Sequence, residues 1–261
     1  MLNNDKPIHR IGESKMAKMI DKKPSWKGEG LLWDSLNNNL PSDNVVYNQR
    51  EINGREYDFC VMAENMGILV IEVKGWDPDK VTVNGVDNIE VEGYDEPQTS
   101  PKKQARAYRF AILNKISAKY NVSPLVLDMV CYPFITEEQY KAINLDIVSE
   151  PEYTLFKEDI ENGEKLNAKI QGVFNLNKFI PHFEFTYDLM FRIRRSLEPA
   201  LKQAHTSVEV HPYSKLRVFP DEVSSDIAKL IVEEYFDGIK QIVFVSSKKD
   251  FDLIISRLNS G

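Results

Sequence analysis

The chain has 261 residues, of which 42% are hydrophobic and 28% are charged, with a formal charge of −7 at pH 7. This composition is typical of a globular protein with a sizeable core, and it excludes a disordered chain or a disulfide-stapled miniprotein. No apolar run approaches the roughly 18 residues that a membrane span needs, and residues 1–21 lack the apolar region of a signal peptide. We therefore expect a cytoplasmic protein without membrane contact, and its acidic balance excludes a global basic footprint for nucleic acid.

Hydrophobic periodicity and turn residues predict the elements along the chain. In order, these are a helix over residues 26–40, strands over 45–49, 55–63 and 68–73, an exposed hairpin over 81–94, a helix over 101–120, strands over 125–132 and 153–156, a mostly helical stretch over 177–203, a helix over 221–235, a strand over 241–246 and a helix over 249–258. This order predicts an α/β protein with a mixed central sheet flanked by helices.

Three regions follow from this pattern. Residues 1–25 are expected to form an N-terminal arm or short helix, and residues 26–204 the main domain. Residues 205–261 are expected to form a small α/β appendage with the order helix–strand–helix. This appendage is too small to own a sizeable core, so we expect it to pack on the main domain or to belong to something larger.

Three charged residues stand at the ends of two predicted strands. Glu72 and Lys74 are separated by one residue, so on a strand both point to the same face. Asp58 lies in the preceding strand, where antiparallel pairing brings it close to Glu72. Two converging carboxylates repel each other, and a divalent cation such as Mg²⁺ relieves that repulsion. A lysine beside such a cation can orient an attacking water and offset transition-state charge.

The alternative is an ordinary ion pair between Glu72 and Lys74 at a strand end, with Asp58 in a turn. The three-residue pattern by itself favours that alternative, because it occurs by chance in many proteins. Further residues change the balance: Glu29 opens the first predicted helix, and Gln104 and Tyr108 lie four residues apart on one face of another.

The combined pattern resembles the nuclease-related domain (NERD) family, a branch of the PD-(D/E)xK nuclease superfamily. The segments that carry the resemblance are GEGLLWDSL, REYDFCVM, GILVIEVKGW and SPKKQARAY, followed by LDMVCYPF and TLFKEDI. The resemblance covers about residues 26–175 and implies a restriction-endonuclease-like fold.

The resemblance also implies roles for single residues. Asp58 and Glu72 would ligate the metal, with the Val73 carbonyl as a further ligand, and Lys74 would be the catalytic lysine. Glu29 would support the metal or its waters. The Q-x-x-x-Y element of Gln104 and Tyr108 would lie near the active site. Tyr57 replaces the proline of the superfamily motif, a departure that the superfamily tolerates.

The charge distribution supports a local anion-binding surface. Between Gln98 and Leu127 there is no acidic residue, whereas six Lys and Arg residues lie there. The alternative is a solvated helix face, but such faces usually mix the two signs. The region from Asp77 to Glu96, in contrast, carries seven acids and one lysine, which predicts an acidic hairpin that faces away from DNA or limits its access. The residues expected to contact nucleic acid are Lys102, Lys103, Arg106, Tyr108, Arg109 and Trp76.

The leading hypothesis is a Mg²⁺-dependent deoxyribonuclease, with Mn²⁺ able to substitute, that hydrolyses phosphodiester bonds by water attack. Its catalytic residues would be Lys74, Glu72, Asp58, Glu29 and Gln104. The resemblance further implies DNA as the partner and a helicase or ATPase domain or subunit as an associate, in DNA repair or phage defence. A homo-oligomer and either endonuclease or exonuclease action are compatible with the sequence. The alternative function is a non-catalytic nucleic-acid-binding or assembly module on the same fold.

Overall fold

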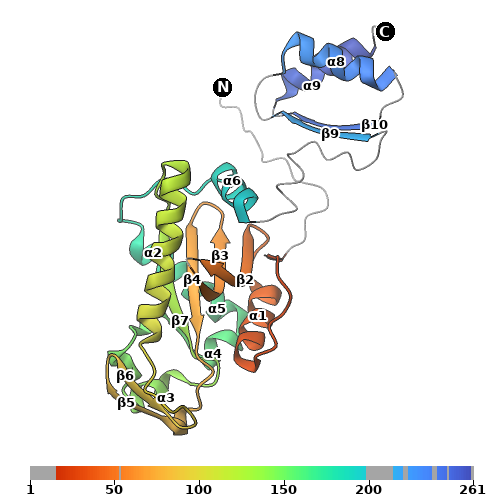
Figure 1. The fold of residues 1–261 in the computed structure, drawn as a ribbon. Helices are drawn as coiled ribbons and strands as arrows, with labels where there is room; N and C mark the ends of the chain where they lie inside the picture. Colours follow the sequence, from red (N-terminus) through yellow and green to blue (C-terminus); the bar gives the residue numbers. More distant parts are fainter. Residues whose placement is uncertain are drawn as a thin grey trace, which may run out of the picture. The chain divides into compact units, whose positions relative to one another are not determined.

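The computed structural model of the chain describes residues 16–52, 54–197, 214–219, 223–236, 240–245 and 247–259. The chain divides into two units between Met190 and Phe191 (Figure 1). Residues 1–15 of the expected N-terminal arm lie outside the described residues, as do residues 198–203 of the expected helical stretch and residues 221, 222 and 246 of the expected C-terminal elements.

A mixed sheet forms the centre of the first unit, with strand order β1-β2-β3-β4-β7-β8. The β2–β3 and β3–β4 pairs are antiparallel, whereas the β1–β2, β4–β7 and β7–β8 pairs are parallel. The strands are β1 (Lys18–Met19), β2 (Asn44–Ile52), β3 (Arg55–Ala63), β4 (Gly67–Val73), β7 (Val126–Cys131) and β8 (Thr154–Leu155). The α/β class with a mixed central sheet, expected from the sequence, is confirmed.

Helices cover both faces of this sheet (Figure 1). One face packs a large apolar core together with α1 and α5, and α2 lies across the other face against β4 and β7. Successive strand residues point to opposite faces, which explains why every residue of β4 is buried. The helices of this unit are α1 (Lys27–Asn39), α2 (Pro101–Tyr120), α3 (Glu137–Ala142), α4 (Lys157–Ile160) and α5 (Gly163–Asn177), and α6 (Tyr187–Leu197) spans the division between the two units.

The bounds of α2 have clear local causes. The Ser100 hydroxyl accepts a hydrogen bond from the backbone N–H of Lys103 at 3.3 Å, and Pro101 occupies the first turn, where no intrahelical N–H is needed. The helix ends at Asn121, whose φ of 54° lies in the left-handed region that asparagine tolerates. The helix predicted over residues 101–120 is confirmed at both ends.

The stretch predicted to be helical over residues 177–203 is wrong in its first part. The structure has a helix before it, α5, and a second helix, α6, that begins at Tyr187. Pro181 lies in the intervening segment, and proline disrupts a helix interior because it has no N–H to donate. Phe183 and Phe185 instead make backbone hydrogen bonds with Ser123 and Asn65.

The acidic hairpin consists of β5 (Val81–Gly85) and β6 (Asn88–Val91), with a short 3₁₀ helix (Pro78–Lys80) before it. Its apolar residues and the Trp76 side chain join a second core around Tyr132 and Tyr140. Two further 3₁₀ turns, Leu145–Ile147 and Pro151–Tyr153, lie between α3 and β8.

The second unit contains β9 (Ser214–Phe219), α8 (Ser225–Phe236), β10 (Lys240–Val245) and α9 (Lys248–Leu258). β9 and β10 are paired in parallel, with α8 as the connection between them. The helix–strand–helix order expected for the C-terminal region therefore needs correction, because a strand precedes it and completes a β–α–β–α unit. Within the described residues, no helix combines the length and apolar character needed to cross a bilayer.

Candidate active site

The carboxylates of Asp58 and Glu72 lie at the adjoining ends of β3 and β4. The last residue pair of their ladder joins Phe59 to Ile71, and continuing this register by one residue sets Asp58 opposite Glu72. Directly opposed residues of an antiparallel pair point to the same face. The Oδ2 atom of Asp58 accepts a hydrogen bond of 2.6 Å from the backbone N–H of Val73, which ties the two strand ends together.

Lys74 lies directly beyond β4 and pairs with Glu72. Its Nζ atom donates to Oε1 of Glu72 at 2.8 Å. Glu72 is only 5% exposed, and its second oxygen, Oε2, is buried and has no hydrogen-bond partner among the described residues. A buried carboxylate oxygen without a partner is costly, so this atom is an unused acceptor at the centre of the site.

The electrostatics of the site disfavour two ionised carboxylates in the absence of a cation. Burial, and after it the charge of Glu72, raises the pKa of Asp58 to about 7. Burial also raises the pKa of Glu72, against the opposing effect of Lys74. Two carboxylates and an unused buried oxygen fit a hard divalent cation, since Mg²⁺ typically takes one or two carboxylates and completes its shell with water and substrate oxygens. No cluster of three or more His, Cys, Asp or Glu residues suited to a metal ion occurs among the described residues.

Glu29 reaches this region from the first turn of α1. Burial, followed by the charge of Asp58, raises its pKa to about 7. Gly28 allows the approach: a Cβ atom there would lie 2.9 Å from Pro133 Cγ and 3.4 Å from the Cα of Gly75. A side chain at position 28 would therefore press against the ring of Pro133, which would have to shift.

Gln49 is a residue of this region that the sequence analysis did not single out. Its Nε2 donates to Oε2 of Glu29 at 3.0 Å. It has a φ of 51°, in the left-handed region that is uncommon for glutamine, and it interrupts the β2–β3 ladder opposite Asp58, between the pairs Asn48–Phe59 and Arg50–Tyr57. No sequence signal marks this conformation, because glutamine is not a residue that favours it.

Gln104 and Tyr108 lie on α2. The Nε2 atom of Gln104 donates to the Thr99 hydroxyl at 3.0 Å, and its Oε1 atom is buried without a hydrogen-bond partner among the described residues. Tyr108 is half-buried. Gln104 is thus bonded to Thr99, which lies two residues before the first residue of α2.

Lys102, one of the residues expected to contact DNA, lies inside the protein. Lys102 is buried, its Nζ lies 3.2 Å from Asp128 and 3.3 Å from Glu150, and it stacks over the ring of Tyr153 at 4.2 Å. Arg109 pairs with the same Asp128 at 3.0 Å. Asp128 lies in β7 beneath α2 and needs these cations, because a buried carboxylate must be paired.

Other residues of the expected nucleic-acid surface also differ in exposure. Arg106 and Lys103 are exposed, and Lys103 pairs with Asp87 of the hairpin. Trp76 is only 4% exposed and packs against Tyr132 with ring centroids 5.9 Å apart. The indole of Trp76, also expected to contact nucleic acid, is thus part of the core beneath the hairpin.

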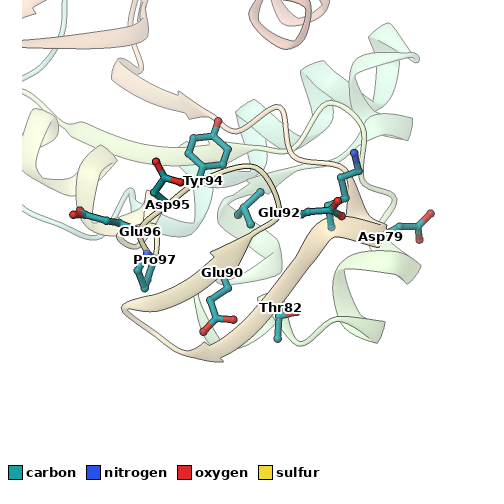
Figure 2. A pocket seen from close by; sticks show the side chains of 10 residues that line it. Asp79, Thr82, Glu90, Glu92, Tyr94, Asp95, Glu96 and Pro97 are labelled. Atoms are coloured by element: carbon teal, nitrogen blue, oxygen red, sulfur yellow. The ribbon is translucent and has the colours of Figure 1, made fainter.

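The hairpin carries a hollow of about 480 Å³ on its surface. Figure 2 shows carboxylates around it, and the residues that carry them are Asp79, Glu90, Glu92, Asp95 and Glu96. All of these acids are exposed, as the sequence predicts for the region from Asp77 to Glu96. Carboxylates predominate on this surface, although Lys80 also lines the hollow, and such a surface repels a polyanion.

Comparison with known proteins gives one family match. Residues 24–133 match the model of the nuclease-related domain. No curated protein matches the chain. A solved structure, a repair endonuclease from Pyrococcus abyssi, aligns at 15% sequence identity and a TM-score of 0.22, over 42% of this chain and 35% of its own length. The match thus spans about a third of that endonuclease.

Proposed function

We propose that this chain, whose residues 24–133 match the model of the nuclease-related domain, is a Mg²⁺-dependent deoxyribonuclease. The observation that carries the proposal is the meeting of Asp58, Glu72 and Lys74 at the ends of β3 and β4. There, a backbone hydrogen bond and an ion pair fix the two carboxylates beside one lysine. Such an arrangement suits hydrolysis of a phosphodiester, whose transition state needs both cation binding and positive charge.

Asp58 and Glu72 would hold the metal, which, when bound, would supply Lewis-acid polarisation of the scissile phosphate. The remaining work falls to side chains. The Lys74 ammonium lies on the same face as both carboxylates, where it can orient a water and offset negative charge that develops on the phosphate oxygens. A water oxygen bonds to phosphorus while the bond to the leaving oxygen breaks. Glu29, whose pKa of about 7 allows proton exchange near neutrality, can accept a proton from that water.

The exposed cations of α2 are the proposed contact with the DNA backbone. They are Lys103, Arg106, Lys115 and Lys119, and no acidic residue lies in α2. Among the ion pairs of the described residues, Arg106, Lys115 and Lys119 take no part. The buried Lys102 and the paired Arg109 are left out of this surface. A role in DNA repair or defence and association with a helicase or ATPase remain proposals based on the family resemblance.

The second candidate function is a non-catalytic nucleic-acid-binding or assembly module. The ion pair of Lys74 and Glu72 supports it, because this pair partly satisfies the buried carboxylate without a metal. The orphaned Oε2 of Glu72 favours the catalytic proposal, since the lysine leaves that oxygen unpaired.

A plasmid-nicking assay separates the two functions. The intact protein should convert supercoiled to nicked DNA with Mg²⁺ or Mn²⁺, and a chelator should stop the conversion. Glu72→Gln should abolish cleavage and keep the fold, whereas Glu138→Gln, on the exposed surface of α3, should cleave like the parent. Cleavage by the Glu72→Gln protein at the parental rate would refute the assignment. Metal-independent DNA binding without cleavage by the parent would favour the second function.

A further inference from the structure

The segment Lys22-Lys23-Pro24-Ser25-Trp26-Lys27, which we call the lysine–tryptophan segment, runs from β1 to the start of α1. Its Trp26 is 72% exposed, although tryptophan is a residue that proteins usually bury for the most part. The three lysines are exposed as well, and no acidic residue lies within the segment. The other two tryptophans differ, since Trp76 is buried and Trp33 is half-buried and packs against the main core.

The backbone of the segment is anchored beside the candidate active site. Asn48 of β2 donates from Nδ2 to the Lys22 carbonyl at 3.0 Å, and its backbone N–H donates to Asp21 at 3.1 Å. Arg50 holds the same Asp21 with three hydrogen bonds, of 2.7, 2.9 and 3.1 Å. Asn48 and Arg50 flank Gln49, whose side chain binds Glu29. The segment therefore runs alongside β2, whose Gln49 binds Glu29. It leads into α1, and Trp26 precedes Glu29 by three residues.

Close packing at the start of α1 further fixes the segment. The backbone N–H of Gly30 donates to the Trp26 carbonyl at 2.8 Å, and a Cβ at position 30 would lie 3.2 Å from Cε of Lys23. Pro24 is buried. The exposed indole is thus carried by a fixed backbone, so that it offers a flat apolar face at little cost in ordering when a ligand stacks on it.

An exposed aromatic ring among lysines is the chemistry that holds unpaired nucleic acid: the ring stacks on a base, and the cations follow the phosphates. In a duplex the base faces are covered by their neighbours, so stacking on Trp26 requires a nucleotide outside the helix. We propose that the lysine–tryptophan segment is a platform that holds an unpaired DNA strand beside Asp58 and Glu72. Single-stranded or frayed DNA is then the substrate class of this site. This inference rests on the proposed nuclease function.

The test measures binding without turnover, using the full chain with Glu72→Gln in the presence of a chelator. A single-stranded oligodeoxythymidylate of about 20 nucleotides should bind more tightly than a blunt duplex of equal length at the same salt, and it should quench tryptophan fluorescence. Trp26→Ala should weaken single-strand binding by roughly 5- to 150-fold, the effect of losing one stacked base, and should remove the quench. Trp26→Phe should keep most of the affinity.

Phe179→Ala provides the matched control, because Phe179 is a 79% exposed aromatic of the same unit outside the segment, and its loss should leave the affinity unchanged. Lys22→Ala and Lys27→Ala should each lower the slope of log affinity against log salt by about 0.7 on single strands. Equal single-strand affinity of the Trp26→Ala and parental proteins, or equal quenching by blunt duplex, would overturn the proposal. This binding test does not depend on cleavage. If the parental protein binds single strands through Trp26 but does not cleave DNA in the nicking assay, the nuclease function is refuted and the platform stands.

Discussion

Single residues set the chemistry of the strand ends. The Asp58–Val73 hydrogen bond and the Glu72–Lys74 pair both lie where the ladder between β3 and β4 ends. The positions of Asp58, Glu72 and Lys74 could be predicted from sequence, because the strand period and an antiparallel register fix which side chains share a face. The positions of Gln49 and Lys102 could not, since a left-handed glutamine and a buried ion pair depend on tertiary neighbours.

The raised pKa of Asp58 predicts a pH-dependent penalty. The pKa of an aspartate in the unfolded chain is about 4, whereas the pKa of Asp58 in the folded protein is about 7. The folded state therefore binds the proton more tightly. The contribution of Asp58 to the free energy of unfolding is therefore fully present below about pH 4 and is lost as the pH rises through about 7. In chelator, the melting temperature of Asp58→Asn relative to the parent should rise between about pH 5 and about pH 8. A difference that stays constant over this range, as expected for Glu138→Gln, would contradict the assigned pKa.

Lys74→Ala should separate chemistry from binding. Loss of a group that stabilises transition-state charge should lower the cleavage rate by roughly two orders of magnitude or more. The affinity for DNA, measured with Ca²⁺ to prevent turnover, should change far less. Equal losses of rate and affinity would mean that the lysine anchors a phosphate in the ground state.

Gln49→Gly should act on Glu29 without harm to the fold. Glycine accepts a positive φ without strain, so the free energy of unfolding should stay equal or rise, while the hydrogen bond to Glu29 is lost. We expect the cleavage rate to fall by about tenfold, on the order of one lost hydrogen bond to a charged group. In a Glu29→Ala background the same change should have no further effect. Asn65→Gly, which also replaces a residue of positive φ (62°), serves as the control and should cleave normally.

At the scale of elements, α2 carries both buried, ion-paired cations and exposed cations, and its own sequence does not distinguish the two kinds. Its cations look like one strip in the sequence, yet the helix buries Lys102 against Asp128 and exposes Arg106, about one turn further on, to solvent. The signal that could have distinguished them is Asp128 itself, a lone acid within the apolar run of β7, which requires a partner from the element packed on it.

Two sets of substitutions in α2 should therefore have different outcomes. Lys103→Glu with Arg106→Glu should weaken binding to duplex DNA, with the melting temperature nearly unchanged. The salt slope should fall by about 0.9 for each phosphate that the variant no longer neutralises. Lys102→Met should instead reduce the free energy of unfolding by up to about 3–5 kcal/mol, because Asp128 loses one of its two cations. Full stability of the Lys102→Met protein would show that Arg109 suffices for Asp128.

Elements with strong local signals are the ones predicted well. α2 begins and ends where its proline and its left-handed asparagine indicate, and β4 is the continuous apolar run. α5 was not predicted, although Leu166, Ile170 and Val173 follow helical spacing. β9 was not predicted either, although its lysine and arginine alternate with apolar residues, as in a half-buried strand. Its pairing with β10 spans the whole of α8.

At the scale of the whole molecule, the two units have cores of unequal size. Among the described residues, the first has an extensive core on the sheet and another beneath the hairpin. The core of the second unit is built around Val223, Ala228, Ile231 and Ile254 among the described residues. A small core buries less surface for each ordered residue and gives a marginal free energy of unfolding.

Calorimetry of the full chain should therefore show two transitions, with the smaller and earlier one belonging to the second unit. Ile231→Ala should lower the temperature of the first transition and leave the second in place. Leu69→Ala, in the core of the sheet, should do the reverse. A single cooperative transition that both variants shift equally would show that the units fold together.

The apolar residues of the hairpin of β5 and β6 point inward. Val81, Ile89 and Val91 pack on Trp76, while the acids shown in Figure 2 point outward and are exposed. Its outward charge can therefore be rewritten without disturbing the sheet, because surface substitutions away from caps and cores usually change stability by less than about 0.5 kcal/mol. The charge of the hairpin can therefore be engineered: replacing Glu90 and Glu92 with lysine would convert a surface that repels DNA into one that attracts it. A series of such variants should show graded affinities for DNA while the carboxylates of the candidate site stay unchanged.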